Sequence, residues 1–266
     1  MNAGWALLIA WLLAALGMTL GWGWQQRHAN AGIVDVLWAA GLGGSAVLIA
    51  SLGDGASAPR VLLALCGGIW GARLAQHLWR RVRRENEDGR YQALRARWHN
   101  SALKFLAFFQ GQAASIALFA LPFVAVADNP RSEPLALGAG VAMWMIAVTG
   151  EALADTQLAR FRADPAHRAQ TCRNGLWRYS RHPNYFFEWL HWFTYVLLAI
   201  GSPLWALSVV GPLAMGVFLC FVSGIPFTEQ QALRTRGTDY RDYQRSTSIL
   251  IPWPPKRPRP SSARRP

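Results

Sequence analysis

Residues 32–52 read GIVDVLWAAGLGGSAVLIASL and contain a single charged side chain, Asp35. A stretch of about 20 apolar residues is long enough to cross the roughly 30 Å hydrocarbon core of a bilayer as a helix. The same kind of run recurs along the chain, at 3–24, 32–52, 60–79, 102–127, 134–158, 185–202 and 203–225. We therefore predict an all-α integral membrane bundle of seven transmembrane helices, with Gly201-Ser202-Pro203 turning the last two into a hairpin.

The composition agrees with a membrane protein. Hydrophobic residues make up 52% of the 266 residues and charged residues 15%, whereas a soluble domain carries about 25% charge. We expect one membrane domain over residues 1–253, a helical cytoplasmic connector at 80–101, and a basic, Pro-rich, disordered tail at 254–266.

Basic residues predict the orientation. The expected outer loops are 53–59 and 128–133, and only Arg60 and Arg131 of the 27 Lys and Arg lie in or beside them. Because positive residues stay on the cytoplasmic side, the N-terminus is predicted outside and the C-terminus in the cytoplasm of a cell inner membrane. The formal charge of +13 then reflects this bias and attraction to anionic membrane lipid, and we expect no nucleic-acid partner.

The three cysteines, Cys66, Cys172 and Cys220, form no CxxC pair and have no metal-ligand spacing with histidine. We therefore predict neither a disulfide nor a metal site.

Charged side chains inside predicted spans are costly, so they indicate a functional interior. Their helical spacing forms one polar stripe on each of three spans. The stripes comprise Arg73, His77, Arg80 and Arg84; Glu151, Asp155 and Arg162; and Asn184, Glu188, His191 and Tyr195. We expect a shared cavity open to the cytosol, although interior ion pairs that only hold helices together would leave the same pattern.

Residues 173–189 read RNGLWRYSRHPNYFFEW and lead into the sixth run. Pro183 suits the first turn of a helix, so Arg178, Arg181 and His182 precede a helix N-terminus, which attracts anions. Asn184 can donate and accept hydrogen bonds, as an amide or base edge requires. The alternative is that these arginines only reach lipid phosphates. The connector carries its own cluster, ENEDGRY at 85–91, which predicts either a solvated charged face or a lid over the cavity.

Motifs that carry a resemblance lie along nearly the whole chain, including GARLAQHLWRR at 71–81, ENEDGRYQALRARW at 85–98 and FFQGQ at 108–112. Three of them lie in the C-terminal half: GLWRYSRHPNYFFEW at 175–189, ADTQLARFR at 154–162 and DYRDYQRSTSILIPW at 239–253. They resemble the C-terminal domain of membrane steroid 5-alpha-reductases. Together with GIVDVLWAAGL at 32–42, they resemble most closely the bacterial relatives of the DUF1295 type.

The resemblance implies a seven-helix bundle that holds NADPH in a cavity open to the cytosol. It assigns Asp155, Arg162, Asn184 and Tyr185 to the cofactor wall, with Glu188 beneath them. The full set of expected cofactor contacts is Glu151, Asp155, Arg162, Arg173, Arg178, Tyr179, Arg181, His182, Asn184, Tyr185, Tyr240 and Tyr243.

The expected reaction is the NADPH-dependent reduction of a carbon–carbon double bond conjugated to a carbonyl, in a steroid- or isoprenoid-like lipid. One of Asp35, Arg73, His77 and Glu188, all expected to be buried, would donate a hydrogen bond to the carbonyl. The chain departs from the steroid enzymes in two places. It lacks their Gln-Glu pair on the second span, and Leu78 stands where they carry a catalytic tyrosine.

Two other functions stay open. RHPNY at 181–185 and EQQALRTRGTDYRDY at 229–243 also resemble isoprenylcysteine carboxyl methyltransferases, which bind S-adenosylmethionine. That cofactor has no phosphates, so the number of arginines favours a pyridine nucleotide. A non-catalytic lipid-binding membrane protein is the third interpretation.

Overall fold

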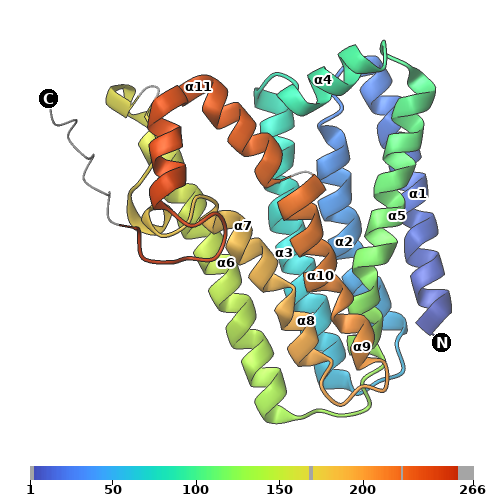
Figure 1. Ribbon diagram of the computed structural model, residues 1–266. Coiled ribbons are helices and arrows are strands. Elements are labelled where there is room, and N and C mark those ends of the chain that lie inside the picture. The colour runs from blue at the N-terminus through green and yellow to red at the C-terminus, as the bar shows by residue number, and fades with distance from the viewer. Residues whose placement is uncertain (1–2, 168–169, 223, 257–266) are drawn as a thin grey trace, which may run out of the picture. The chain divides into compact units, whose positions relative to one another are not determined.

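The computed structural model describes residues 3–167, 170–222 and 224–256 (Figure 1). Its long helices are α1 (Ala3–His28), α2 (Ile33–Leu52), α3 (Ser57–Arg84), α5 (Ala102–Ala127), α6 (Pro134–Ala163) and α11 (Ile225–Ser246). Its shorter helices are α4 (Gly89–Arg97), α7 (Pro183–His191), α8 (Phe193–Leu198), α9 (Trp205–Ser208) and α10 (Val210–Val217). Two short 3-10 helices are η1 (Pro165–His167) and η2 (Gly175–Arg178), and η3 (Phe218–Val222) is a π-helical segment.

Six helical segments are long and apolar enough to cross a membrane: Gly4–His28, Ile33–Leu52, Ser57–Arg84, Ala102–Ala127, Pro134–Ala163 and Trp205–Ser246. The prediction of an all-helical, multi-pass membrane protein is thereby confirmed. The run predicted at 185–202 is not among the six, because it is divided between the nine-residue α7 and the six-residue α8.

Two boundary predictions change. The connector expected at 80–101 is not one helix, because α3 continues to Arg84 and α4 begins at Gly89. Asp88 caps α4 by accepting a hydrogen bond from the backbone N–H of Arg90 at 2.9 Å, which favours a fresh helix start there. The predicted tail at 254–266 lies, from residue 257 onward, outside the described residues.

The internal contacts of the chain divide it into two compact units. Unit 1 combines residues 1–144 with 192–214, and unit 2 combines 145–191 with 215–266. Helices α6 and α10 each contribute residues to both units. These boundaries fall inside apolar helices, where hydropathy does not change, so hydropathy did not predict the division into two units.

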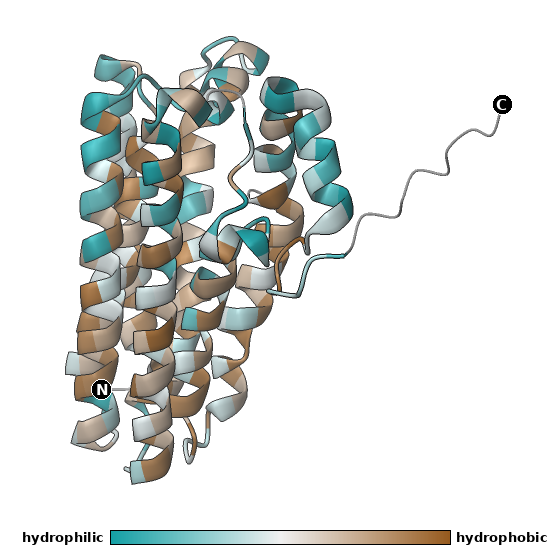
Figure 2. Ribbon diagram, turned by 90° about the vertical axis from the view of Figure 1, so that its left-hand side faces the viewer, coloured by the Kyte–Doolittle hydropathy of each residue, from teal (hydrophilic) through white to brown (hydrophobic). Residues whose placement is uncertain are grey.

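Unit 1 is built around α2, which packs against α1, α3 and α5. The contact with α3 is close because glycines meet there: a Cβ added to Gly71 would lie 2.6 Å from the Cα of Gly43. The aromatic core of this unit consists of fully buried Trp70, Trp192, Tyr195, Phe105, Phe109, Phe119 and Phe123. Large apolar side chains are exposed on these helices, among them Leu12, Leu16 and Leu20 of α1, and Figure 2 shows hydrophobic colours along much of the helices and hydrophilic colours toward one end.

The end of unit 1 opposite α4 is closed by backbone and amide contacts. The side-chain amide of Asn129 donates to the carbonyls of Leu198 and Ile200, both at 3.0 Å. Gly201 has a φ of 98°, a conformation that glycine adopts without strain. The sharp turn predicted at Gly201-Ser202-Pro203 is thus present between α8 and α9.

Unit 2 contains the second part of α6, α7 and α11. The indole N–H of Trp177 donates to the carbonyl of Ala154 at 2.9 Å, which ties η2 to α6. Helix α7 begins at Pro183, as predicted. The hydroxyl of Tyr243 donates to the carbonyls of Trp177 and Ser180, so α11 holds the segment that leads into α7.

Candidate functional site

The carboxylate of Glu229 on α11 is the centre of a hydrogen-bond network in unit 2. It accepts from Arg181 Nε at 2.6 Å, from Tyr240 at 3.2 Å and from Gln244 at 2.8 Å. His182 Nε2 lies 3.3 Å from the same carboxylate. A carboxylate with these neighbours is well satisfied despite its low exposure. Glu229 therefore fixes the two residues that immediately precede α7.

Arg181 is committed to this internal network. Its Nη1 also donates to the carbonyls of Gln244 and Thr247, both at 2.9 Å. Because the guanidinium binds three protein groups, the arginine that the sequence assigns to an anion at the helix N-terminus is here a link between α7 and α11.

Asn184 and Asp155 form the contact that joins α7 to α6. The amide Nδ2 of Asn184 donates to Oδ1 of Asp155 at 3.2 Å. One residue further along α7, the hydroxyl of Tyr185 lies 3.1 Å from that of Thr228 on α11. The Tyr185 ring also stacks on His182, with centroids 5.3 Å apart. Three helices of unit 2 thus bring polar side chains to the first turn of α7.

The remaining residues predicted to contact a cofactor also lie in unit 2, but they differ in their partners and in their exposure. Arg173 binds Asp239 at 2.7 Å at the surface, and Tyr243 bonds backbone carbonyls. Glu151 is buried, and Glu188 is half-buried on α7. Exposed side chains are those of Arg162, Arg178 and Tyr179.

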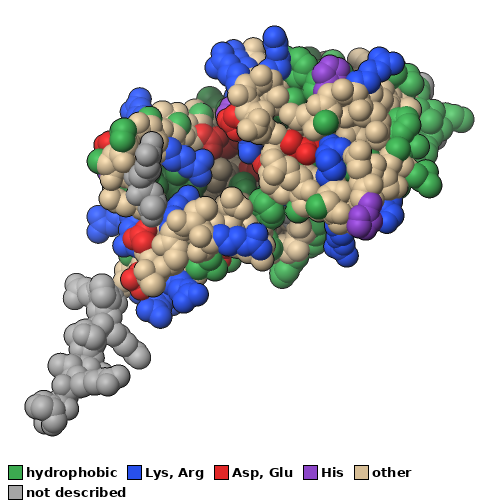
Figure 3. All heavy atoms as spheres, turned by 90° about the horizontal axis from the view of Figure 1, so that it is seen from above, with side chains coloured by type: hydrophobic (Ala, Val, Ile, Leu, Met, Phe, Trp, Pro, Cys, Tyr) green, Lys and Arg blue, Asp and Glu red, His purple; other side chains and the backbone are tan. Residues whose placement is uncertain are grey.

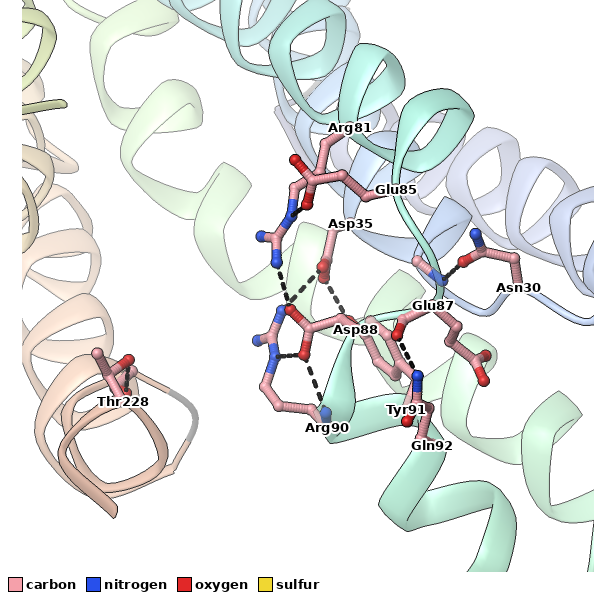
Figure 4. Close-up of polar contacts among 12 residues, drawn as sticks. Asn30, Asp35, Arg81, Glu85, Glu87, Asp88, Arg90, Tyr91, Gln92 and Thr228 are labelled. Atoms are coloured by element: carbon pink, nitrogen blue, oxygen red, sulfur yellow. Dashed lines mark hydrogen bonds and ion pairs between the residues drawn. The ribbon is translucent and has the colours of Figure 1, made fainter. Parts of the chain in front are cut away.

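The predicted catalytic residues outside α7 belong to unit 1. Asp35, in the first turn of α2, is bound by α4: Tyr91 donates to it at 2.6 Å and Arg90 at 3.1 Å (Figure 4). On α3, Arg73 is half-buried, whereas His77 is exposed. The expectation that His77 is buried is therefore wrong, because it lies on the outward face of α3.

The contacts of Asp35 extend into a larger ionic network. Asp88 bridges Arg90 at 3.2 Å and Arg81 at 2.7 Å. Burial alone would raise the pKa of Asp88, but the backbone N–H of Arg90 and the charges of Arg90 and Arg81 lower it below its usual value. Burial, and then the charge of Asp35, raise the pKa of Tyr91 well above its usual value. Tyr91 thus stays a hydrogen-bond donor.

A second set of contacts holds the same connector to α1. Arg95 donates to Glu87 at 2.8 Å and to Gln25 at 3.2 Å. Glu87 in turn accepts from the backbone N–H of Ala31 at 2.8 Å. The cluster at 85–91 is therefore mostly engaged in binding the ends of α1, α2 and α3, which the charge pattern alone did not indicate.

Among the residues that the structure describes, no group of three or more His, Cys, Asp or Glu side chains is arranged to hold a metal ion. The three cysteines are unpaired. What unit 2 offers instead is a carboxylate, an amide and hydroxyls at the start of a helix, together with exposed arginines. Such groups bind a polar organic molecule by hydrogen bonds.

The helices define a multi-pass α-helical membrane protein, and polar side chains of unit 2 gather at the start of α7. The family model described as "Protein of unknown function (DUF1295)" matches residues 21–247, so the chain belongs to this family. The comparisons with curated proteins and with solved structures return no significant match. The DUF1295 part of the expectation is thereby confirmed, and the resemblance to membrane steroid 5-alpha-reductases stays a prediction.

Proposed function

We propose that this protein is a membrane oxidoreductase that uses NADPH to reduce a carbon–carbon double bond conjugated to a carbonyl, in a steroid- or isoprenoid-like lipid. The observation that carries the proposal is the contact of Asn184 with Asp155 beside Tyr185 in unit 2. These are residues that the resemblance to membrane steroid 5-alpha-reductases assigns to the cofactor wall.

The chemistry of these groups fits the cofactor. The Asn184 side chain offers an amide edge that can pair with a carboxamide, and Asp155 can accept from ribose hydroxyls. Since Arg181 is held by Glu229, we assign the phosphates to the exposed arginines, Arg162 and Arg178. NADPH, when bound, would supply the hydride and both electrons.

The protein's own part is to orient the substrate and polarise its carbonyl. Of the four expected donors, Asp35, Arg73 and His77 belong to unit 1, whereas Glu188 belongs to unit 2 with the proposed cofactor contacts. Glu188 lies one helical turn from Asn184 on α7, so both side chains share one face. We therefore assign carbonyl polarisation to Glu188, whose carboxyl would act in its protonated form.

The topology that goes with this function has seven spans, with α7 and α8 together forming one of them. We place the N-terminus outside and the C-terminus in the cytoplasm of the inner membrane, because nearly all basic residues fall on one side of the spans. The start of α7 would then face the cytosol, where NADPH is available.

A competitive thermal-shift measurement in detergent tests the proposal. NADPH should raise the melting temperature, since a ligand at 100 times its Kd stabilises by about 2.7 kcal/mol. S-adenosylhomocysteine should not. Stabilisation by S-adenosylhomocysteine alone would identify a methyltransferase, and the absence of a response to either compound would identify a non-catalytic lipid-binding protein. Tyr240 donates to Glu229, and Tyr243 donates to backbone carbonyls, so these three residues favour neither cofactor over the other.

A further inference from the structure

The ends of α1 and α3 in unit 1 carry a cluster of aromatic and basic side chains, which we call the tryptophan cluster: Trp24, His28, Trp79 and Arg83. Trp24 stacks on His28 with ring centroids 4.1 Å apart, and it lies 6.3 Å from Trp79. The guanidinium of Arg83 lies over the Trp79 ring at 5.8 Å. Residues 55 positions apart in the sequence are thus joined at the surface of one unit.

Hydrogen bonds hold this cluster in place. Nδ1 of His28 lies 2.9 Å from the carbonyl of Trp24, and this contact makes that nitrogen the donor and fixes the ring on Trp24. The end of α1 is further held by the indole N–H of Trp22, which donates to the carbonyl of Ala102 at 2.9 Å. A site with ordered aromatic rings loses little conformational entropy when a ligand binds.

An exposed apolar surface continues from the cluster along both helices. It includes Leu16 and Leu20 on α1 and Leu65 and Ile69 on α3, all exposed. The α2 face that also stays exposed carries small residues, Ala40, Gly44 and Val47. A Cβ added to Gly44 would meet nothing within 4 Å, so the surface there is open to an acyl chain.

The cations at the end of this surface are available to an anion. Acids of the neighbouring connector pair with other arginines, Glu85 and Asp88 with Arg81 and Glu87 with Arg95. Among the ion pairs of the described residues, none uses Arg27 or Arg83, which are both exposed in the last turns of α1 and α3. Figure 3 shows basic side chains gathered at this end of unit 1.

We propose that the tryptophan cluster, with Arg27, binds the headgroup phosphate of an anionic phospholipid. Along each helix, the side chains change from apolar to aromatic to basic, in the same order as the acyl chains, the interface and the phosphate of a lipid. Apolar residues come first, then Trp24 and Trp79, whose rings suit the membrane interface. Arg83 follows one turn beyond Trp79, about 6 Å farther along the axis, where it can donate two hydrogen bonds to a phosphate.

The favoured ligand is a lipid rather than a soluble phosphate compound. A soluble anion would gain only the two arginines at an exposed, solvated surface, where charge contacts contribute little. A phospholipid adds the contact of its chains with the apolar face and attraction of its net charge to the basic residues. We expect phosphatidylglycerol to bind better than zwitterionic phosphatidylcholine.

Native mass spectrometry of the full-length protein tests this proposal, with the protein released from micelles that contain equal amounts of phosphatidylglycerol and phosphatidylcholine. The natural sequence should retain phosphatidylglycerol preferentially. Arg83→Ala and Arg27→Ala should each lower this retention about fivefold, the effect of removing one basic contact near a lipid surface. Arg97→Ala removes an exposed arginine of α4 and should change nothing.

Two further variants test how the lipid is bound. Arg83→Lys should retain part of the preference, because it keeps the charge without the planar donor pair. Trp79→Phe should stay folded by circular dichroism and lose part of the retention. Equal retention of the two lipids by the natural sequence, an equal loss in Arg97→Ala, or release of the lipid by millimolar inorganic phosphate would each overturn the proposal.

Discussion

Two carboxylates on α11, those of Glu229 and Asp242, show how burial changes the contribution of an ion pair to stability. The side chain of Glu229 is 15% exposed and that of its partner Arg181 10%, whereas Asp242 and Arg245 are 64% and 80% exposed. Water screens the second pair but hardly reaches the first. An exposed pair contributes about 0–1 kcal/mol, while breaking a buried pair leaves a charge without compensation.

Glu229→Gln should therefore destabilise the protein by about 2–4 kcal/mol, because Arg181 loses its charged acceptor. Asp242→Asn, the same change on the same helix, should stay within about 0.5 kcal/mol. Melting temperature in detergent is the measurement. Similar losses in the two variants would mean that Glu229 is not the organising group of unit 2.

Asn184 supports a prediction about binding. Asn184→Asp keeps the shape but removes the amide donor and puts a second carboxylate beside Asp155, so NADPH affinity should fall at least about tenfold. Asn174→Asp, an exposed position in the same unit, is the matched control and should bind normally. Affinity is read from the NADPH concentration that produces half of the thermal shift. If both variants bind like the natural sequence, Asn184 lies outside the cofactor site.

At the scale of elements, the crossing of α2 and α3 depends on glycine. A Cβ on Gly71 would lie 2.6 Å from the Cα of Gly43 and 2.8 Å from the carbonyl oxygen of Ala39. These are backbone atoms, which cannot rotate away, so the helices would have to separate.

We expect Gly71→Ala to destabilise unit 1 by about 1–3 kcal/mol, the usual cost of overpacking. Gly44→Ala, on the open face of α2, should be neutral or stabilising by up to about 1 kcal/mol, because alanine is the better helix former. The contrast is measured by thermal unfolding of both variants. Equal effects would show that the crossing tolerates a wider separation.

Helix α4 is held to the bundle mainly by polar contacts rather than by apolar burial. Tyr91 is its one buried residue, 4% exposed, and its hydroxyl donates to Asp35. Tyr91→Phe keeps the ring but removes this bond. We expect faster amide hydrogen exchange in Gly89–Arg97 and unchanged exchange in α5, because local stability is set by local contacts. Protection in α4 that stays as high as in the natural sequence would contradict this.

At the scale of the whole molecule, the topology makes a direct prediction. Helix α5 has 26 residues and is therefore about 39 Å long, so the α4 end of unit 1 and the loop at 128–133 should lie on opposite sides of the membrane. With Cys220 replaced by serine, Ser132→Cys should react with a membrane-impermeant maleimide in intact cells. Arg97→Cys should react only after the cells are opened. The reverse pattern would invert the proposed orientation.

The sequence by itself determined the class of this protein. A long apolar run such as 102–127 is predicted to cross the membrane as a helix. The lipid offers no hydrogen-bond partner to the backbone N–H and C=O groups, and a helix pairs these groups within the segment itself. Pro183 determined where α7 begins, since proline fixes φ and needs no N–H partner in the first turn. Both inferences rest on local chemistry, which a sequence displays directly.

Only the tertiary structure decided which polar residues meet. Arg181 and Glu229 are 48 positions apart, and their contact converts an expected anion ligand into an internal link. Asp35 is bound by Tyr91 from 56 positions away, and the apolar run at 185–202 is divided between two units. Such pairings depend on how helices pack, and helical periodicity specifies which face a side chain occupies but not which neighbour covers it.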